Sequence, residues 1–355
     1  MLNLCFKTYL CGVLCIKKNK KMKRLNQISL FALAFSAIIV LSSWGAWGHY
    51  HINKAAVFAL PDSMRTFFYN HIDYVTEESV VPDLRKFAIV DKSEAGRHYV
   101  DIEDFDKPLD SLMNWSSDYA YSKYNEKDLQ KKGFLPWFIQ DVMEKLTKAF
   151  QEKKRTDILF LSADLAHYLG DAHVPLHTTN NHDGQLTNQR GIHAFWESQL
   201  PEMFGEGYNL KVAEAQYIPD VRLETWRIIQ STNMLVDSVL RVEKNLSNTY
   251  PKDGIYVKDK LGNVVKNKYR QWIHTPEYTK QYHDALKNMV ENQLRASITA
   301  VSSYWLTAWV NAGRPDLSTL DAESLTKQNA KNYKKELKTW RKEGKLMNMK
   351  PANEF

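Results

Sequence analysis

The sequence predicts an all-α protein built as a single multi-helix domain. In several long segments apolar residues recur every three or four positions, which is the spacing of one face of a helix. Strand-like alternation with turn residues occurs in one stretch, 252–272, and predicts a small β-hairpin insertion. No run rich in Pro, Gly or Ser divides the 355 residues. We therefore expect one helical domain over residues 44–355.

The first 43 residues have the composition of an export segment. Lys23 and Arg24 precede a largely apolar run, 28–41, which is followed by the small residues Ser42 and Ser43. We therefore expect a signal peptide over 22–43, an upstream extension over 1–21, and a mature chain that is periplasmic or secreted. All three cysteines lie in the extension, so the mature chain has no thiol ligand and needs no disulfide.

The charge of the mature chain is balanced. Seven of the 48 Lys and Arg residues lie before residue 44, and the 41 that remain equal the 41 acids. A balanced charge does not indicate a strongly basic groove for binding nucleic acid. No later stretch approaches the roughly 20 apolar residues of a membrane span, so we expect no integral span in the mature chain, and no obligate protein partner is evident.

The first part of the mature chain predicts short helices separated by irregular segments. WGAWGHYH, at 44–51, is rich in glycine and aromatic residues and is expected to be irregular. Residues 53–60 predict a short helix stopped by Pro61, with Asp62 or Ser63 capping the next one. Pro82 and Asp83 interrupt the chain, and RHYVDIED around His98 predicts a short extended or irregular stretch. These loops are expected to carry ligands.

Longer helices follow. A helix opens near Pro136 with an apolar face of Phe138, Val142, Leu146 and Phe150. Another is expected over 156–172, and two long amphipathic patterns follow at 220–246, with Leu223 on the apolar face, and at 277–312. The charged stretch from Asp321 predicts a solvated helix or a fraying tail.

The helix over 156–172 carries the strongest chemical signal, HYLGDAHVPLH at 167–177. His167 and Asp171 lie one turn apart on one face, and Pro175 ends the helix so that His177 returns to the same end. His193 and Glu197 repeat the four-residue spacing in IHAFWESQL. These pairs predict a polynuclear metal site with imidazole and carboxylate ligands.

A single His-x-x-x-Asp pair is more often an exposed or hydrogen-bonded pair than a metal site. Here the histidines lie among leucines, and burying several ionisable groups is costly unless they are paired or bind metal. Further ligands are expected from loops, where the candidates are His49, His51, Asp83, His98 and Asp101. By residue type alone none of these five can be singled out.

Five separated motifs resemble, in order, the superfamily of bacterial zinc-dependent phospholipase C and of the fungal and plant single-strand-specific nucleases. They are WGAWGH from Trp44, PDLR at Asp83, RHYVD at His98, HYLGDAHVPLH and HAFWES. The match covers about residues 44–200. The resemblance implies an almost wholly α-helical fold, a cleft with three zinc ions, and cleavage of phosphate esters.

The resemblance also implies a ligand for each ion. By this resemblance, Asp83, His98 and His167 bind the first ion, and Asp171 bridges it to the second. The second ion is also bound by His49 and by the amino group and carbonyl of Trp44. The third ion is bound by His177, His193 and Glu197. The nucleases usually have Asp at the last position and the phospholipases Glu, which this chain has. Cleavage after Ser43 would free the Trp44 amino group, whereas cleavage after Ser42 would leave Ser43 in front of it.

These residues predict an exported zinc-dependent phosphodiesterase in which a metal-activated water attacks the phosphodiester. We expect Asp83 to orient or deprotonate that water. The first hypothesis is a phospholipase C-like activity that releases a phospholipid head group. A single-strand-specific nuclease or 3′-nucleotidase, aided by aromatic stacking, is the second. A noncatalytic zinc-binding exported protein is the third, which the number of ligands disfavours because a structural zinc needs four.

Overall fold

The computed structural model describes residues 44–88, 93–321, 325 and 327–349. The predicted upstream extension and signal peptide, residues 1–43, lie outside the described residues. Within the described part the chain is mostly helical, and its only β-structure consists of isolated antiparallel bridges. No helix in this part is long and apolar enough to cross a membrane. The all-α fold class is confirmed.

The longer helices account for most of the described chain. They are α2 (Gly45–Ala59), α3 (Asp62–Asn70), α4 (Ile72–Glu78), α5 (Val81–Ala88), α7 (Ser117–Lys123), α8 (Glu126–Lys132), α9 (Leu135–Gln151), α10 (Arg155–Asp171), α13 (Val221–Asn233), α14 (Val236–Thr249), α15 (Pro276–Ala285), α16 (Met289–Asn311) and α17 (Lys327–Glu343). Shorter helical pieces are α6 (Leu109–Leu112), α11 (Ile192–Ala194), α12 (Leu200–Phe204), and the turns η1 (Ala95–His98), η2 (Ile102–Asp104), η3 (Pro175–Thr178), η4 (Phe195–Gln199), η5 (Gly205–Gly207), η6 (Lys252–Gly254) and η7 (Leu317–Thr319).

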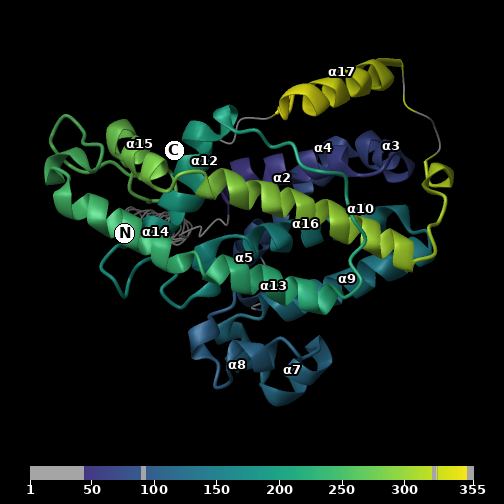
Figure 1. The fold of residues 1–355 in the computed structure, drawn as a ribbon, viewed down its shortest axis with the longest axis horizontal. Coiled ribbons are helices and arrows are strands. Elements are labelled where there is room, and N and C mark those ends of the chain that lie inside the picture. The colour runs from purple at the N-terminus through teal and green to yellow at the C-terminus, as the bar shows by residue number, and fades with distance from the viewer. Residues whose placement is uncertain (1–43, 89–92, 322–324, 326, 350–355) are drawn as a thin grey trace, which may run out of the picture. The chain divides into compact units, whose positions relative to one another are not determined.

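The core forms where α16 packs against α2, α9 and α10 (Figure 1). Large aromatic side chains fill it, and five tryptophans are fully buried: Trp44, Trp137, Trp196, Trp226 and Trp305. Trp305 of α16 stacks on Phe68 at a centroid distance of 4.8 Å, and its indole nitrogen donates to the Ser162 carbonyl of α10 at 3.0 Å. These contacts hold α3, α10 and α16 together while leaving no unpaired donor on Trp305.

The irregular start expected at 44–51 is wrong, because α2 begins at Gly45. Two glycines make this possible. Trp44 and Gly45 both have positive φ, 45° and 52°, a conformation that glycine adopts without strain. Gly48 lies under Trp44, where an added Cβ would be 2.8 Å from the Trp44 Cβ. These glycines allow the indole to pack closely against its own helix.

Three other boundaries differ from the sequence predictions. Pro82 and Asp83 lie in the first turn of α5, not in a loop. Proline is tolerated there because the backbone N–H groups of the first turn have no hydrogen-bond partner within the helix, so the N–H that proline lacks is not needed. Asp62 begins α3 itself, and no side chain caps that helix. The patterns 220–246 and 277–312 each divide into two helices.

Further differences lie in α13, between α15 and α16, and in the stretch 252–272. Leu223 was expected on the apolar face, but its side chain is 52% exposed, so that expectation is wrong. The chain turns at Lys287, which has a φ of 57°, between α15 and α16. In place of the predicted hairpin, the described chain has three isolated antiparallel bridges, which pair Tyr256 with His274, Lys258 with Val264 and Lys266 with Trp272.

We expect Gly205→Ala to destabilise the fold. A Cβ on Gly205 would lie 2.1 Å from the buried indole of Trp47, so the tightly packed ring must move. Overpacking of this kind lowers the free energy of unfolding by about 1–3 kcal/mol. Gly207→Ala is the matched control, because an added Cβ there meets nothing within 4 Å. Urea denaturation should separate the two variants, and equal midpoints would contradict the prediction.

Candidate metal centre

Three clusters of buried ligand groups lie in the described chain. One joins His49, His167 and Asp171, the second joins Asp83, His98 and His167, and the third joins His177, His193 and Glu197. In each cluster the candidate ligand atoms lie within 4.8 Å of one another. The eight side chains that the sequence proposed as ligands are therefore all brought together, from five separate parts of the chain.

Asp171, the last residue of α10, connects two of the clusters. Its Oδ1 lies 3.5 Å from His49 Nε2, whereas its Oδ2 lies 2.8 Å from His98 Nδ1 and 3.3 Å from His167 Nε2. The two oxygens of one carboxylate thus face different groups of imidazoles. This is the geometry of a carboxylate that can bridge two cations.

The residues of the third cluster lie on the turn η3, on the short helix α11 and on a π-helical turn. After α10, η3 returns the chain so that His177 Nδ1 lies 3.9 Å from Asp171 Oδ2. His193 and Glu197 follow on α11 and on the single π-helical turn η4. Glu197 Oε2 lies 3.0 Å from His193 Nε2 and 3.4 Å from His177 Nε2. Such π turns are frequent at functional sites.

Trp44 contributes its backbone to the same region. Its nitrogen donates to Glu197 Oε2 at 3.1 Å, and its carbonyl accepts from the Gly48 nitrogen at 3.1 Å. The resemblance assigned this nitrogen to the second ion, and the structure places it against a residue of the third cluster. The indole nitrogen donates to the Gly170 carbonyl at 2.7 Å, which fixes Trp44 against the end of α10.

The donor set fits zinc. Ligand atoms about 2.0–2.1 Å from a tetrahedral zinc lie about 3.4 Å from one another, close to the separations in all three clusters. Within the described residues, Glu197 Oε1 and His193 Nδ1 are buried and have no hydrogen-bond partner. A buried polar atom without a partner is costly, and a nearby cation would reduce that cost for the carboxylate.

Burial sets the protonation of these groups. It lowers the pKa of His49 to about 3 and that of His193 to about 4, so both rings are neutral at neutral pH and can present a lone pair. Burial lowers the pKa of His167 too, but Asp171 and Asp83 outweigh it and the net shift is upward. Burial raises the pKa of Glu197 to about 8, an energetic cost that a cation would remove.

Hydrogen bonds outside the clusters orient the imidazoles. His167 Nδ1 donates to the Ser79 carbonyl at 2.7 Å, and His177 Nδ1 donates to the His98 carbonyl at 2.6 Å. In both rings Nε2 is then left to face the centre. Such contacts hold a ligand ring in one tautomer and orientation.

Glu94 is a supporting residue that the sequence reasoning missed. Its Oε1 lies 3.3 Å from His98 Nε2, on the side of the ring away from the clusters. Glu94 also accepts hydrogen bonds from Tyr168, Arg97 and Arg85. Burial raises the pKa of Glu94, but His98, Tyr168 and Arg85 outweigh burial and the net shift is downward. The signal was available, because Glu94 and His98 have the same four-residue spacing as His167 and Asp171.

One of the five loop candidates, His51, points away from the clusters. It donates to the Trp47 carbonyl at 2.6 Å and stacks on the Trp47 ring. His173 also belongs to no cluster, and it donates to the Leu169 carbonyl at 2.7 Å. Asp101 joins no cluster, but it lines the cavity beside the centre.

That cavity has a volume of about 310 Å³ and brings the candidate ligands into contact with open space. His98, His177 and His193 form part of its wall. The remaining wall residues are Lys86, Ala95, Tyr99, Asp101, Lys131, Leu176 and His182. The centre therefore has access for a ligand of several heavy atoms.

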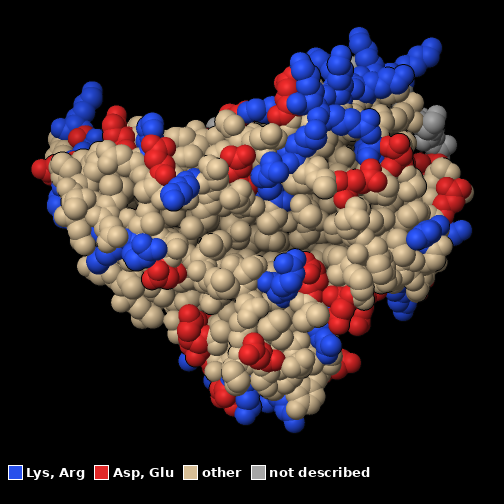
Figure 2. Space-filling view, in the orientation of Figure 1, with Lys and Arg blue, Asp and Glu red and all other residues tan. Residues whose placement is uncertain are grey.

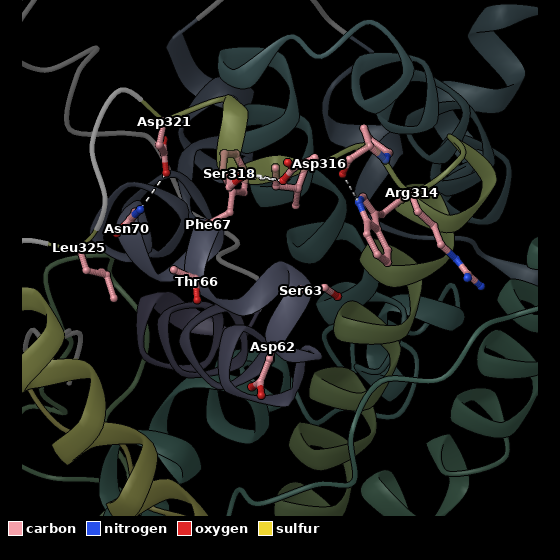
Figure 3. A pocket seen from close by; sticks show the side chains of 13 residues that line it. Asp62, Ser63, Thr66, Phe67, Asn70, Arg314, Asp316, Ser318, Asp321 and Leu325 are labelled. Atoms are coloured by element: carbon pink, nitrogen blue, oxygen red, sulfur yellow. Dashed lines mark hydrogen bonds between the residues drawn. The ribbon is translucent and has the colours of Figure 1, made fainter.

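A larger cavity, of about 740 Å³, lies elsewhere (Figure 3). It lies beside α3, where the Asn70 amide donates to Asp321 at 2.8 Å. Arg314, Asp316 and Ser318 line another part of it. None of the clustered ligands lines this cavity, so size alone does not identify the site.

We expect Glu94→Gln to weaken zinc binding about 10- to 100-fold, the usual cost of losing a group that orients a ligand. Asp164→Asn is the matched control, because Asp164 pairs with Arg85 in the same network at 2.7 Å but belongs to no cluster. Competition with a chromogenic chelator would measure both affinities. Equal zinc affinity in the two variants would show that Glu94 only stabilises the fold.

The chain is similar to known proteins over most of its length. The S1/P1 Nuclease family matches residues 44–312. Nuclease S1 of Aspergillus oryzae (strain ATCC 42149 / RIB 40) is 22% identical over 310 residues, which are 82% of this chain and 98% of that protein. A crystal structure of the Clostridium perfringens alpha-toxin from avian strain SWCP covers 82% of this chain and 68% of its own, with 12% identity and a TM-score of 0.40. The family match spans most of the chain and includes every clustered side chain, and the chain therefore belongs to the S1/P1 nuclease family.

Proposed function

We propose that this phosphoester hydrolase is a zinc-dependent nuclease that cleaves phosphodiester bonds of single-stranded nucleic acid. The observation that carries the proposal is the Asp171 carboxylate, whose Oδ1 faces His49 and whose Oδ2 faces His98 and His167, beside an open cavity. Paired cations at such a position would lower the pKa of water and neutralise charge on a phosphate.

The sequence placed phospholipase C first and the nuclease second. The family match supports the reverse order, and so does the composition of the cavity wall. The Tyr99 hydroxyl donates to the carbonyls of Gln130 and Lys131, which holds its ring at the wall. Such a ring offers a stacking surface to a base. The phospholipase alternative still has Glu197 in its favour.

Asp101 adds a group that can recognise a base edge. Burial raises its pKa to about 7, with Asp104 and Glu103 adding to the effect. Near neutral pH it is therefore present both as an acid that donates and as a carboxylate that accepts. Its Oδ1 is buried and has no hydrogen-bond partner among the described residues. A base stacked on Tyr99 could supply that partner.

Asp83 and Lys86 supply the charges closest to a bound phosphate. Lys86 Nζ donates to Asp83 Oδ1 at 2.7 Å and also lines the cavity. Burial raises the pKa of Asp83, but Lys86 and the neighbouring histidines outweigh it and the net shift is downward. Asp83 is then a persistent carboxylate, better suited to orient a water than to hold its proton. Lys86 would attract the phosphate.

We also propose that the chain is exported and that removal of residues 1–43 makes Trp44 the first residue. Its nitrogen is already buried against Glu197. A free α-amino group has a pKa of about 7.7–8.0, so it can lose its proton and offer a lone pair at this position. Maturation would thereby add a metal ligand to the centre.

A substrate panel tests the proposed activity. We expect the zinc-loaded chain that begins at Trp44 to cleave single-stranded DNA faster than it releases head group from phosphatidylcholine, with a chromogenic diester as a general substrate. Activity should disappear with a chelator and return with zinc. Preferred hydrolysis of the lipid would support the phospholipase alternative, and full zinc loading without hydrolysis of any diester would support a noncatalytic zinc protein.

We expect Asp83→Asn to lower turnover of single-stranded DNA by about 10²- to 10⁴-fold, the usual contribution of a group that positions or transfers the reacting proton. Most zinc should remain, since seven of the eight clustered side chains are unchanged. Asp110→Asn, which removes an exposed carboxylate on α6, is the control. Turnover equal to that of the unmodified chain would refute the role assigned to Asp83.

A further inference from the structure

Helix α17 carries a dense row of basic side chains that the metal centre does not use. We propose that this face of α17 binds the phosphate backbone of a single-stranded nucleic acid, as a second contact for long substrates. The inference rests on the proposed nuclease function for the identity of the polymer. It names a surface that lies beyond the catalytic cavity.

The exposed side of α17 is almost entirely cationic. Seven Lys and Arg residues of the helix are exposed: Lys327, Lys331, Lys334, Lys335, Lys338, Arg341 and Lys342. Glu343 is its only exposed acid, and it pairs with Lys342 at 3.6 Å. Figure 2 shows blue side chains gathered over α17. Like charges three and four residues apart repel one another, and a bound polyanion would remove that cost.

Of the two alternatives expected from Asp321 onward, the described residues form the solvated helix and not the fraying tail, and the other side of α17 packs against α2 and α3. Trp340 stacks on Phe58 of α2 at 6.0 Å between ring centroids, and Tyr333 contacts Tyr69 of α3 at 4.7 Å. Glu336 is buried beside Lys54, with Nζ and Oε2 3.7 Å apart. These contacts fix which side of α17 faces outward, so its basic side chains lie together on one exposed face.

The helix is an addition to the family domain. The family match ends at residue 312, and α17 begins at Lys327. Its charge is therefore not needed to build the matched domain. Residues 44–355 hold 41 basic and 41 acidic residues, and α17 alone accounts for seven of the basic residues but only two of the acids.

The pattern favours a polynucleotide over a lipid surface. Peripheral helices bind membranes by inserting an apolar face, but the apolar side of α17 is taken up by its contacts with α2 and α3. The basic residues recur every three or four positions, which is a rise of about 5–6 Å, along roughly 22 Å of helix. A line of single charges of this length suits the regularly charged backbone of a strand.

The position of α17 makes the contact useful to the metal centre. Both are attached to α2, which carries His49 in one cluster and Phe58 under Trp340. These residues are nine positions apart, about 14 Å along the helix. A strand long enough to reach from α17 to the cavity would then have a raised local concentration of phosphodiester near the centre.

Binding of a fluorescent 30-nucleotide oligo(dT) would test the proposal. The zinc-loaded chain carrying Asp83→Asn serves as the reference, so that the strand stays intact. In this background we would replace Lys331, Lys334, Lys335 and Lys338 by Gln, which keeps helix propensity, and in parallel by Arg, which keeps the charge. Lys107, Lys127, Lys145 and Lys148, which are exposed on other elements, replaced by Gln form the charge-matched control.

We expect the Gln variant of α17 to bind at least 10-fold more weakly at 0.1 M salt. The slope of log affinity against log salt concentration should become less negative by about 3, since each of the four lost phosphate contacts contributes about 0.7 for single strands. The Arg variant and the control should keep both values. Unchanged affinity and slope in the Gln variant would overturn the proposal.

Binding to vesicles of phosphatidylglycerol, measured for the same variants, tests the alternative that α17 binds a lipid surface. Loss of vesicle binding in the Gln variant, with oligo(dT) binding unaffected, would assign α17 to a lipid surface and overturn the proposal. The titration records binding and not turnover. Failure of the unmodified chain to cleave single-stranded DNA would therefore refute the proposed function, while the oligo(dT) result would still decide the role of α17.

Discussion

The structure depends on burying five imidazoles and three carboxylates at one end of a helical core. Desolvating so many ionisable groups is expensive, and the cost falls only when they neutralise one another or share cations. Asp171 illustrates the balance. Burial raises its pKa, yet His167 and His177 outweigh burial and hold it well below the usual range. The centre is therefore assembled around one carboxylate that every neighbouring cluster approaches.

Rigid elements supply the precision that such a centre needs. Helices α2, α5 and α10 each deliver side chains to it, and η3 reverses the chain so that His177 meets the same carboxylate. Behind them Glu94, with Arg85, Arg97 and Tyr168, forms a buried network around His98. Ligands on rigid elements with hydrogen-bonded supports lose little entropy when a cation binds.

The sequence predicted the centre better than it predicted the elements that carry it. The four-residue pairs at 167–171 and 193–197 required only helical periodicity, and the structure agrees with both. Asp83 and His98 could not be singled out by residue type, because their approach to His167 is a long-range event; the family resemblance identified them. The helical start of α2 escaped prediction because its glycines look like breakers locally. They are required instead by close packing against Trp44, which no local pattern records.

The end of α10 has one further consequence. Helix carbonyls at a carboxyl terminus carry partial negative charge, and here they accompany Asp171 at the last position of α10. This partial charge and the Asp171 carboxylate would both favour a cation at this point, and ions held there would connect α2, α5 and α10 to one another. Metal supply would then govern how long the chain survives proteases in its surroundings, because the free energy of binding metal adds to that of folding.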